Sequence, residues 1–272
     1  MKLTVLTDNN TIIDRYLLGE PGLSFYLEDG EESLLFDVGY SDVFLQNART
    51  LGIDLANVPR IAFSHGHDDH TRGLLALHQQ SMLAGKTIVA HPAALNPKYR
   101  DVDGQRLDMG APFTADALQQ ICTLQLSQEP VQLTEHLLWL GQIPRTFAFE
   151  QHIPNSFTIQ NGIAQPDLLL EDTALVYIGT DGLSIITGCS HSGICSIVDY
   201  ARHIYPEQPV TRIIGGFHLF ENNDRLQQTC AYLQTLQLKE LYPCHCVSLA
   251  AKIEFSKTLP VKELGAGEVF EW

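Results

Sequence analysis

The stretch Ser64-His65-Gly66-His67-Asp68-Asp69-His70 carries three imidazoles and two carboxylates within the six positions 65–70. It follows a short apolar run, residues 60–64, that predicts a β-strand. Imidazole nitrogen and carboxylate oxygen are ligands that suit Zn²⁺, Mn²⁺ and Fe. Because side chains alternate along a strand, the first two histidines can point the same way, and the following turn can bring the last aspartate and histidine round. The stretch therefore predicts ligands for two neighbouring metal ions; a histidine-rich surface loop is the alternative interpretation.

The composition indicates a soluble globular protein. The chain has 272 residues, of which 44% are hydrophobic and 18% are charged, so it is long enough for a large core in a single domain. Its 17 basic residues face 32 acidic ones, for a formal net charge of −15. This charge repels phosphate backbones and argues against a nucleic-acid partner. An anionic small-molecule substrate stays compatible, because two bound divalent cations would reverse the local field.

The sequence favours a cytoplasmic protein with no membrane partner. Residues 1–8 are too short and too polar for a signal peptide, and they predict a first strand instead. No apolar stretch reaches the roughly 18 residues that a membrane span needs. Six cysteines form no Cys-x-x-Cys pair, which indicates reduced thiols. The sequence does not indicate an oligomeric state.

Strand and helix signals divide the chain into three parts. The first part predicts strands over residues 3–6, 23–27, 33–37, 60–64 and 87–91, with helices over 43–51 and 71–83. Residues from about 96 to 165 are rich in Gln, Thr, Asp and Pro, and we expect an insertion or cap over the site, with a helix over 115–122 and a strand over 135–140. The last part predicts a hairpin over 174–187 and then alternating helices and strands over 193–205, 211–214, 225–236, 240–242 and 249–258.

Strands in the last part end in histidine-bearing turns. These turns are Gly188-Cys189-Ser190-His191, Gly215-Gly216-Phe217-His218 and Pro243-Cys244-His245-Cys246. Open α/β sheets build their sites at the C-terminal ends of strands, and helices that alternate with strands cover the faces of a sheet. Together with the 65–70 stretch, the pattern predicts an α/β fold of the four-layer αββα sandwich type, formed by residues 1–272 as one domain.

These motifs resemble the metallo-β-lactamase-fold superfamily of metal-dependent hydrolases. Its signature His-x-His-x-Asp-His is matched by His65, His67, Asp69 and His70. Further motifs occur in order, among them Leu35-Phe36-Asp37-Val38-Gly39, Gly188-Cys189-Ser190-His191-Ser192-Gly193-Ile194 and Cys244-His245-Cys246. They are similar to the branch that includes 7,8-dihydropterin-6-methyl-4-(β-D-ribofuranosyl)aminobenzene-5'-phosphate synthase.

The resemblance implies two divalent metal ions as cofactors, with Zn expected first and Mn, Fe or Mg as alternatives. One ion would be held by His65, His67 and His191, and the other by Asp69, His70 and His245. Many relatives bridge the two ions with an aspartate after a glycine, where this chain has Cys189. A cysteine thiolate as the replacement ligand and a small buried thiol are both open interpretations.

The resemblance also assigns roles around the two ions. Asp37 would orient the metal-binding loop. Asp69 would be a ligand and a proton acceptor, and His218 would lie near the substrate as an acid or phosphate contact, or else be a buried, hydrogen-bonded histidine. His152 is a rival to His191 as a ligand. Arg72 departs from the glycine usual in this branch and would bind an anion or lie on a solvated face.

The function implied is that of a dinuclear hydrolase, in which a metal-bound hydroxide attacks a small phosphate-bearing or ester-type substrate. A transferase is the alternative enzyme, in which an arylamine attacks an activated dihydropterin and pyrophosphate leaves. An alternative of another class is a ligand-binding or sensor protein without turnover, although its ligand set would be expected to degenerate. A cysteine nucleophile at Cys189 is a further rival, and there the metal would compete for His191.

Overall fold

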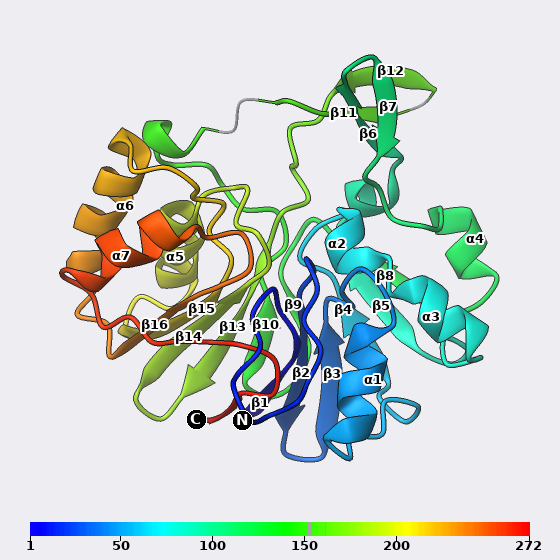
Figure 1. The fold of residues 1–272 in the computed structure, drawn as a ribbon, viewed down its shortest axis with the longest axis horizontal. Coiled ribbons are helices and arrows are strands. Elements are labelled where there is room, and N and C mark those ends of the chain that lie inside the picture. The colour runs from blue at the N-terminus through cyan, green and yellow to red at the C-terminus, as the bar shows by residue number, and fades with distance from the viewer. Residues whose placement is uncertain (152–153, 161) are drawn as a thin grey trace.

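The computed structural model describes residues 1–151, 154–160 and 162–272, and two large sheets form its centre (Figure 1). The first sheet has seven strands in the order β17-β1-β2-β3-β4-β5-β8. Strands β3, β4, β5 and β8 run parallel, and the other pairs are antiparallel. In that order the strands span Val269–Glu271, Lys2–Thr7, Ser24–Asp29, Glu32–Phe36, Arg60–Ala62, Thr87–Ala90 and Thr123–Leu126.

The second sheet has six strands in the order β16-β15-β14-β13-β10-β9. Strands β14, β15 and β16 are parallel, which places their C-terminal ends at one edge of the sheet. In that order the strands span Glu240–Pro243, Val210–Gly215, Gly182–Thr187, Ala174–Gly179, Leu137–Trp139 and Val131–Gln132.

Helices cover the outer face of each sheet (Figure 1). Helices α5 (Ile194–Ile204), α6 (Asp224–Gln234) and α7 (Leu249–Ser256) cover the six-stranded sheet. On the side of the seven-stranded sheet lie α1 (Val43–Thr50), α2 (Asp68–Thr71), α3 (Leu74–Gln79), α4 (Ala115–Gln119) and the short 3₁₀ helix η1 (Pro92–Leu95), while a second 3₁₀ helix, η2, spans Ala148–Glu150. The predicted four-layer αββα sandwich is confirmed.

Three buried apolar layers hold the sandwich together. The layer between the two sheets includes Phe25, Phe36, Trp139, Ile186 and Ile214. Helices α5, α6 and α7 pack on their sheet through residues that include Ile197, Leu226, Leu233 and Phe255. The layer on the other side includes Phe44, Ile61, Leu77 and Ile88. Burial of each such side chain stabilises the fold by about 1.5–3 kcal/mol, and the layers leave only the sheet edges and loops for the site.

The helix expected over residues 71–83 is wrong in its extent. Instead, α2 begins inside the ligand stretch at Asp68, and a separate α3 begins at Leu74. Gly73 lies between them, where a Cβ atom would come 1.9 Å from the carbonyl oxygen of Val38. The chain therefore packs so closely on the loop after β3 that a side chain at this position would not be accommodated.

Residues 96–165 do not form one separate block. Strands β6 (Lys98–Val102), β7 (Gln105–Asp108), β11 (Phe157–Gln160) and β12 (Ile163–Pro166) make a four-stranded sheet that stands apart from the sandwich (Figure 1). Strands β8, β9 and β10, from the same range, belong to the two large sheets. Within the described ranges, no helix is both long and apolar enough to span a bilayer, since the longest, α5 and α6, have 11 residues each.

We expect Trp139 to contribute strongly to the stability of the layer between the sheets. It is fully buried, and its indole Nε1 donates a hydrogen bond of 2.9 Å to the carbonyl of Phe63, one residue before the ligand stretch. We expect Trp139→Phe to lower the free energy of unfolding by about 2 kcal/mol, because it removes volume and leaves that carbonyl unpaired. Urea unfolding followed by circular dichroism measures the change. Trp272→Phe, at the partly exposed C-terminus, is the control, and equal losses in both variants would contradict the prediction.

Candidate metal centre

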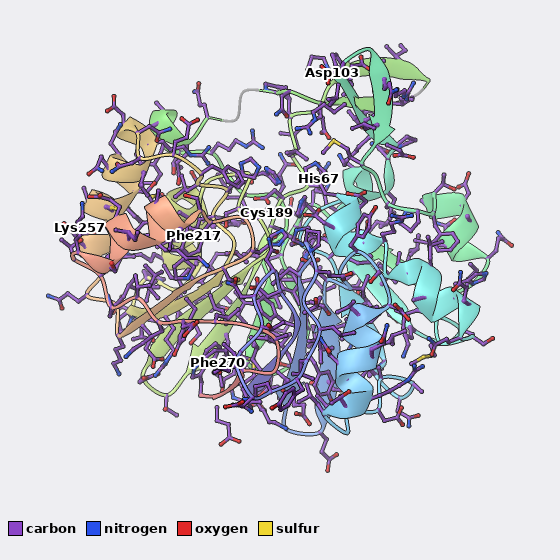
Figure 2. The ribbon with its side chains drawn as sticks, viewed as in Figure 1. His67, Asp103, Cys189, Phe217, Lys257 and Phe270 are labelled. Atoms are coloured by element: carbon purple, nitrogen blue, oxygen red, sulfur yellow. The ribbon has the colours of Figure 1, made fainter. Side chains whose placement is uncertain are left out.

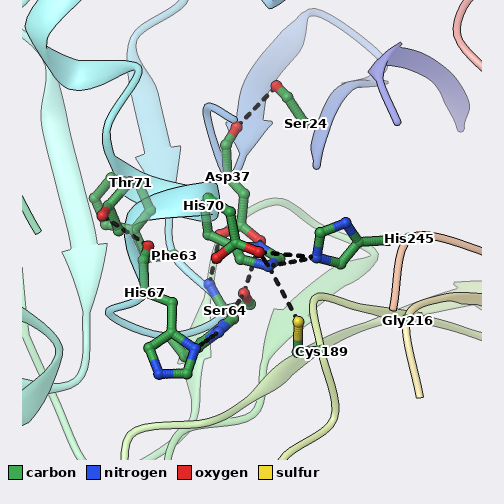
Figure 3. Close-up of polar contacts among 12 residues, drawn as sticks. Ser24, Asp37, Phe63, Ser64, His67, His70, Thr71, Cys189, Gly216 and His245 are labelled. Atoms are coloured by element: carbon green, nitrogen blue, oxygen red, sulfur yellow. Dashed lines mark hydrogen bonds and ion pairs between the residues drawn. The ribbon is translucent and has the colours of Figure 1, made fainter. Parts of the chain in front are cut away.

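Seven potential metal ligands from separate parts of the chain converge where the two sheets meet. Figure 2 labels His67 and Cys189 among them, and Figure 3 also labels His70 and His245. His65 and His67 follow β4, Asp69 and His70 lie in α2, Cys189 and His191 follow β14, and His245 follows β16. All of these loops leave the C-terminal ends of parallel strands, as the sequence indicates. The donor atoms form three groups within 4.8 Å: Asp69, His70, Cys189 and His245; His65, Cys189 and His191; and His65, His67 and Asp69.

The closest approaches among the donors are all near 3.2 Å. His65 Nε2 lies 3.1 Å from His67 Nδ1. His70 Nε2 lies 3.2 Å from both Cys189 Sγ and His245 Nε2 (Figure 3). The Asp69 carboxylate completes this group, with Oδ2 3.2 Å from His245 Nε2 and 3.8 Å from His70 Nε2. Two ligands of a tetrahedral zinc ion with bonds of about 2.0 Å lie about 3.3 Å apart, so the spacing suits a common ion.

A buried carboxylate, Asp37, fixes the orientation of His70. Asp37 has no exposed surface and accepts hydrogen bonds from the backbone N–H and the hydroxyl of Ser64, at 2.8 and 2.6 Å. It also accepts one from Nδ1 of His70 at 2.7 Å (Figure 3). Because the carboxylate can only accept here, the proton of His70 is on Nδ1. Its Nε2 lone pair therefore points at Asp69, Cys189 and the ring of His245.

The same carboxylate orients His65 through one intervening hydroxyl. The Ser64 hydroxyl donates its only proton to Asp37. Its oxygen can therefore only accept a hydrogen bond from Nδ1 of His65, which lies 2.9 Å away. His65 is thereby held with its Nε2 lone pair toward the donor cluster. This hydrogen-bond chain matches the way metal-ligating histidines are commonly held, with the distal nitrogen donating to a carboxylate or another acceptor.

Residues after β1 hold His245 from the other side. The backbone N–H of His245 donates to Asp8 Oδ1 at 2.9 Å, and its Nδ1 lies 3.0 Å from Asn9 Oδ1. His245 has a φ of 51°, in the left-handed region that non-glycine residues seldom adopt. With Nδ1 donating to the amide oxygen, the His245 Nε2 lone pair also points into the cluster.

The donor set fits a bound cation. The Nε2 lone pairs of His70 and His245 face each other at 3.2 Å beside the Asp69 carboxylate, an arrangement that only a positive charge between them makes favourable. Burial lowers the pKa of His70, but Asp69 and Asp37 outweigh it and raise that pKa overall. The potential that attracts a proton to His70 would attract a divalent cation more strongly.

Burial shifts His65, His67 and Cys189 toward their neutral forms. It lowers the pKa of His67 to about 4 and, together with the neighbouring imidazoles, holds the pKa of His65 well below its usual range. Neutral imidazole is the form that binds metals. Burial also raises the pKa of Cys189 well above its usual range, which opposes the interpretation of this thiol as an unassisted nucleophile.

The centre opens into a cavity of about 750 Å³. His218 lines this cavity, and its ring centroid lies 4.4 Å from that of His191. Arg72 itself is absent from the lining, but its guanidinium stacks 4.5 Å above the ring of Tyr40, which does line the cavity. His91 lines a different cavity, and His152 lies outside the described residues.

Sequence reasoning missed several residues of the site. If the strand alternation of β16 continued, the Cys246 side chain would point away from that of His245, but Cys246 lines the cavity, and its sulfur accepts a hydrogen bond of 3.2 Å from the backbone N–H of His218. Its left-handed neighbour His245 breaks the strand alternation on which that expectation depended. Arg100 and Arg225 also line the cavity without any motif to mark them. The Asp8–Asn9 pair, by contrast, had a signal, since polar residues follow the first strand directly.

Comparisons with known proteins agree with this architecture. Two proteins of Methanocaldococcus jannaschii are each 27% identical to the chain. One is uncharacterized and aligns over 94% of both chains; the other, a 7,8-dihydropterin-6-methyl-4-(beta-D-ribofuranosyl)-aminobenzene-5'-phosphate synthase, aligns over 100% of this chain and 97% of its own. The crystal structure of Tm1679, a metal-dependent hydrolase of the beta-lactamase superfamily, matches with a TM-score of 0.85 and 29% identity over 100% of this chain and 99% of that one.

A more distant structure shares the fold alone. Zn²⁺-bound PqqB from Methylobacterium extorquens is 11% identical, with a TM-score of 0.60 over 100% of both chains. The family model for the metallo-beta-lactamase superfamily matches residues 17–205, a segment that includes the ligand stretch and the turn after β14. The fold, the convergent donors and this match lead to one conclusion: the chain belongs to the metallo-β-lactamase superfamily.

Proposed function

We propose that the protein is a hydrolase with two divalent cations, most suitably Zn²⁺, acting on a small ester-type or phosphate-bearing substrate. One cation would be held by His65, His67 and His191, and the other by Asp69, His70 and His245. The observation that carries the proposal is the convergence of lone pairs that Asp37 and Ser64 orient, since such an arrangement is unfavourable without a cation.

The cavity residues would divide the chemistry among them. When bound, the two cations would supply Lewis acidity and lower the pKa of coordinated water to near 7. Asp69 keeps 30% of its side chain exposed, so it can accept a proton from water at the edge of the cavity while it contacts His245. His218 lines the same cavity and is placed to donate a proton to a leaving group. The four-stranded sheet contributes Arg100 to the lining, and we assign that sheet the role of a cap.

Cys189 would be a shared ligand. It belongs to two of the three donor groups, the one around His70 and the one around His65. Among the described residues, no other donor belongs to both of these groups. A thiolate here would take the bridging position that an aspartate has in many relatives.

A cobalt-substituted protein tests this role. We expect Co²⁺-loaded protein to show a near-ultraviolet thiolate-to-cobalt charge-transfer band that Cys189→Ser abolishes, because a hydroxyl cannot replace a soft sulfur ligand. Absorption spectra at equal cobalt content measure it. Cys230→Ser, which alters a buried thiol in another core layer, is the control and should keep the band. A band that survives in Cys189→Ser would exclude Cys189 as its source.

The carboxylate of Asp37 provides a second test. In Asp37→Asn the amide presents an N–H group to at least one of the donors that now contact the carboxylate, Ser64 and His70. We expect the affinity for Zn²⁺ to fall about 10–100-fold, measured by competition with a chromogenic chelator. Asp29→Asn is the matched control, since Asp29 also contacts a histidine, His136, but lies outside the cavity lining. Equal affinities in the two variants would contradict the orienting role.

A transferase remains the second candidate, because the full-length match includes the dihydropterin-linked synthase. In that reaction an arylamine nitrogen would form a bond to the pterin methylene carbon, and the carbon–oxygen bond to pyrophosphate would break. The cluster of cations would then bind the leaving pyrophosphate. A binding protein without turnover is the least supported candidate, because every expected ligand residue is present and convergent.

Pyrophosphate release separates the two enzymes. The metal-loaded protein is supplied with a dihydropterin methyl diphosphate, with and without an arylamine, and released pyrophosphate is measured by a coupled assay. A hydrolase should release pyrophosphate at the same rate in both mixtures, because water is its nucleophile. Release that requires the arylamine would overturn the hydrolase proposal in favour of the transferase. His245→Ala should lose either activity, so it reports background release.

A further inference from the structure

Two guanidinium groups line the metal cavity from elements far apart in the fold. Arg100 lies on β6 of the four-stranded sheet, and Arg225 lies in the first turn of α6. Figure 1 shows these elements on opposite sides of the upper part of the molecule. No other lysine or arginine of the described ranges lines this cavity. In a chain with a net charge of −15, two cationic side chains therefore line the cavity that would bind the substrate.

Among the described residues, neither guanidinium has a partner that accounts for its position. In the described part of the chain, Arg100 and Arg225 form no ion pair, whereas Arg212 pairs with both Asp181 and Glu240. The Nε atoms of Arg100 and Arg225 are buried and lack a hydrogen-bond acceptor among the described residues. A buried donor without an acceptor is unfavourable, so a ligand that supplies acceptors would bind there favourably.

Ordered backbone holds both side chains at the cavity. Arg100 is two residues beyond Lys98 on the same face of β6, and the buried Lys98 ammonium anchors that strand through ion pairs with Asp167 at 2.9 Å and Glu171 at 2.6 Å. Strand β6 is also paired on both sides, with β7 and β11. This part of the four-stranded sheet is therefore tied to the segment before β13, and Arg100 is pre-organised.

Arg225 is held by the start of α6. The side chain of Asn223 caps the helix by accepting a hydrogen bond of 3.2 Å from the N–H of Leu226. One turn later, the hydroxyl of Thr229 donates to the carbonyl of Arg225 at 2.8 Å. The guanidinium thus extends from a capped helix end that cannot easily move away from the cavity.

We propose that Arg100 and Arg225 bind an oxyanion of the substrate, a carboxylate or phosphate remote from the bond that is cleaved. A guanidinium offers five N–H donors in a planar fork that matches such oxyanions. The two arginines line the same cavity as the candidate metal ligands, so the reacting bond would face the cations while a remote anion of the same substrate faces the arginines. This inference rests on the proposed hydrolase and narrows its substrates to those with a second, anionic end.

Matched esters test the proposal. The metal-loaded protein and its Arg100→Gln and Arg225→Gln variants are assayed with p-nitrophenyl acetate and with the mono-p-nitrophenyl ester of glutaric acid, which has the same scissile bond and a remote carboxylate. We expect the ratio of kcat/KM for the glutarate ester to that for the acetate ester to fall about tenfold or more in each variant. The loss should appear mainly in KM, and lysine at either position should restore part of it.

Arg106→Gln is the matched control, because Arg106 lies on β7 beside β6 but stacks over Tyr99 outside the cavity lining. It should leave the ratio of the two esters unchanged. A ratio that is the same in wild type, Arg100→Gln and Arg225→Gln would overturn the proposal, as would an equal drop in Arg106→Gln.

A binding measurement keeps this inference separate from the proposed function. Methylene diphosphonate, which cannot be hydrolysed, is titrated into the metal-loaded proteins by calorimetry. Its Kd should rise about tenfold or more in Arg100→Gln and Arg225→Gln and stay constant in Arg106→Gln. If neither ester is turned over but these Kd values rise, the hydrolase proposal fails and the anion site stands. If the esters are turned over but Arg100→Gln and Arg225→Gln leave the ester ratio and the Kd unchanged, the anion site is excluded and the hydrolase proposal stands.

Discussion

The buried carboxylate of Asp37 is the interaction on which the arrangement of the centre depends. A carboxylate without solvent contact is costly unless donors surround it, and Asp37 satisfies this condition with the backbone and hydroxyl of Ser64 and the ring of His70. These contacts join the ends of β3 and β4 to α2. They also leave His65 and His70 with their Nε2 lone pairs directed into the donor cluster, each toward a different donor group. One buried charge thereby sets the loop conformation and the protonation pattern of two candidate ligands.

The loops of the second sheet contact the Asp37–Ser64–His70 arrangement through a very close backbone approach and through residues in left-handed conformations. A Cβ atom on Gly188 would lie 2.0 Å from the Ser64 hydroxyl, so only glycine lets the end of β14 contact the Asp37–Ser64 pair. Asp37, Ser190, His218 and His245 all have φ between 50° and 60°. Such conformations cost about 1–3 kcal/mol each and persist where surrounding contacts determine them. Because these residues surround one donor cluster, the geometry of the donors is maintained at a cost to the stability of the fold. Bound cations would add to the stability of the folded protein.

The sequence predicts the fold and most of the centre because the relevant signals are local. Apolar periodicity and turn residues mark the strands that carry His65, His191 and His245, and parallel strands must bring their C-terminal ends to one edge. Predictions failed where the outcome depends on distant packing. The contact of Gly73 with Val38 divides the expected helix, and the left-handed His245 turns Cys246 into the cavity. Arg100 and Arg225 come to line one cavity only through the tertiary fold, so no spacing in the sequence could reveal them.

A cysteine in the bridging position would change which metal ions the proposed centre binds preferentially. Thiolate is a softer ligand than carboxylate, so Cys189 would favour Zn²⁺ or Fe over Mg²⁺ among otherwise similar nitrogen and oxygen donors. Burial and the neighbouring Cys246 keep the pKa of the Cys189 thiol high without metal. The thiol would therefore become a ligand only as a cation displaces its proton, which couples metal binding to proton release. An aspartate in this position, already ionised, would not require that exchange, so a cysteine ligand would add to the dependence of metal occupancy on pH.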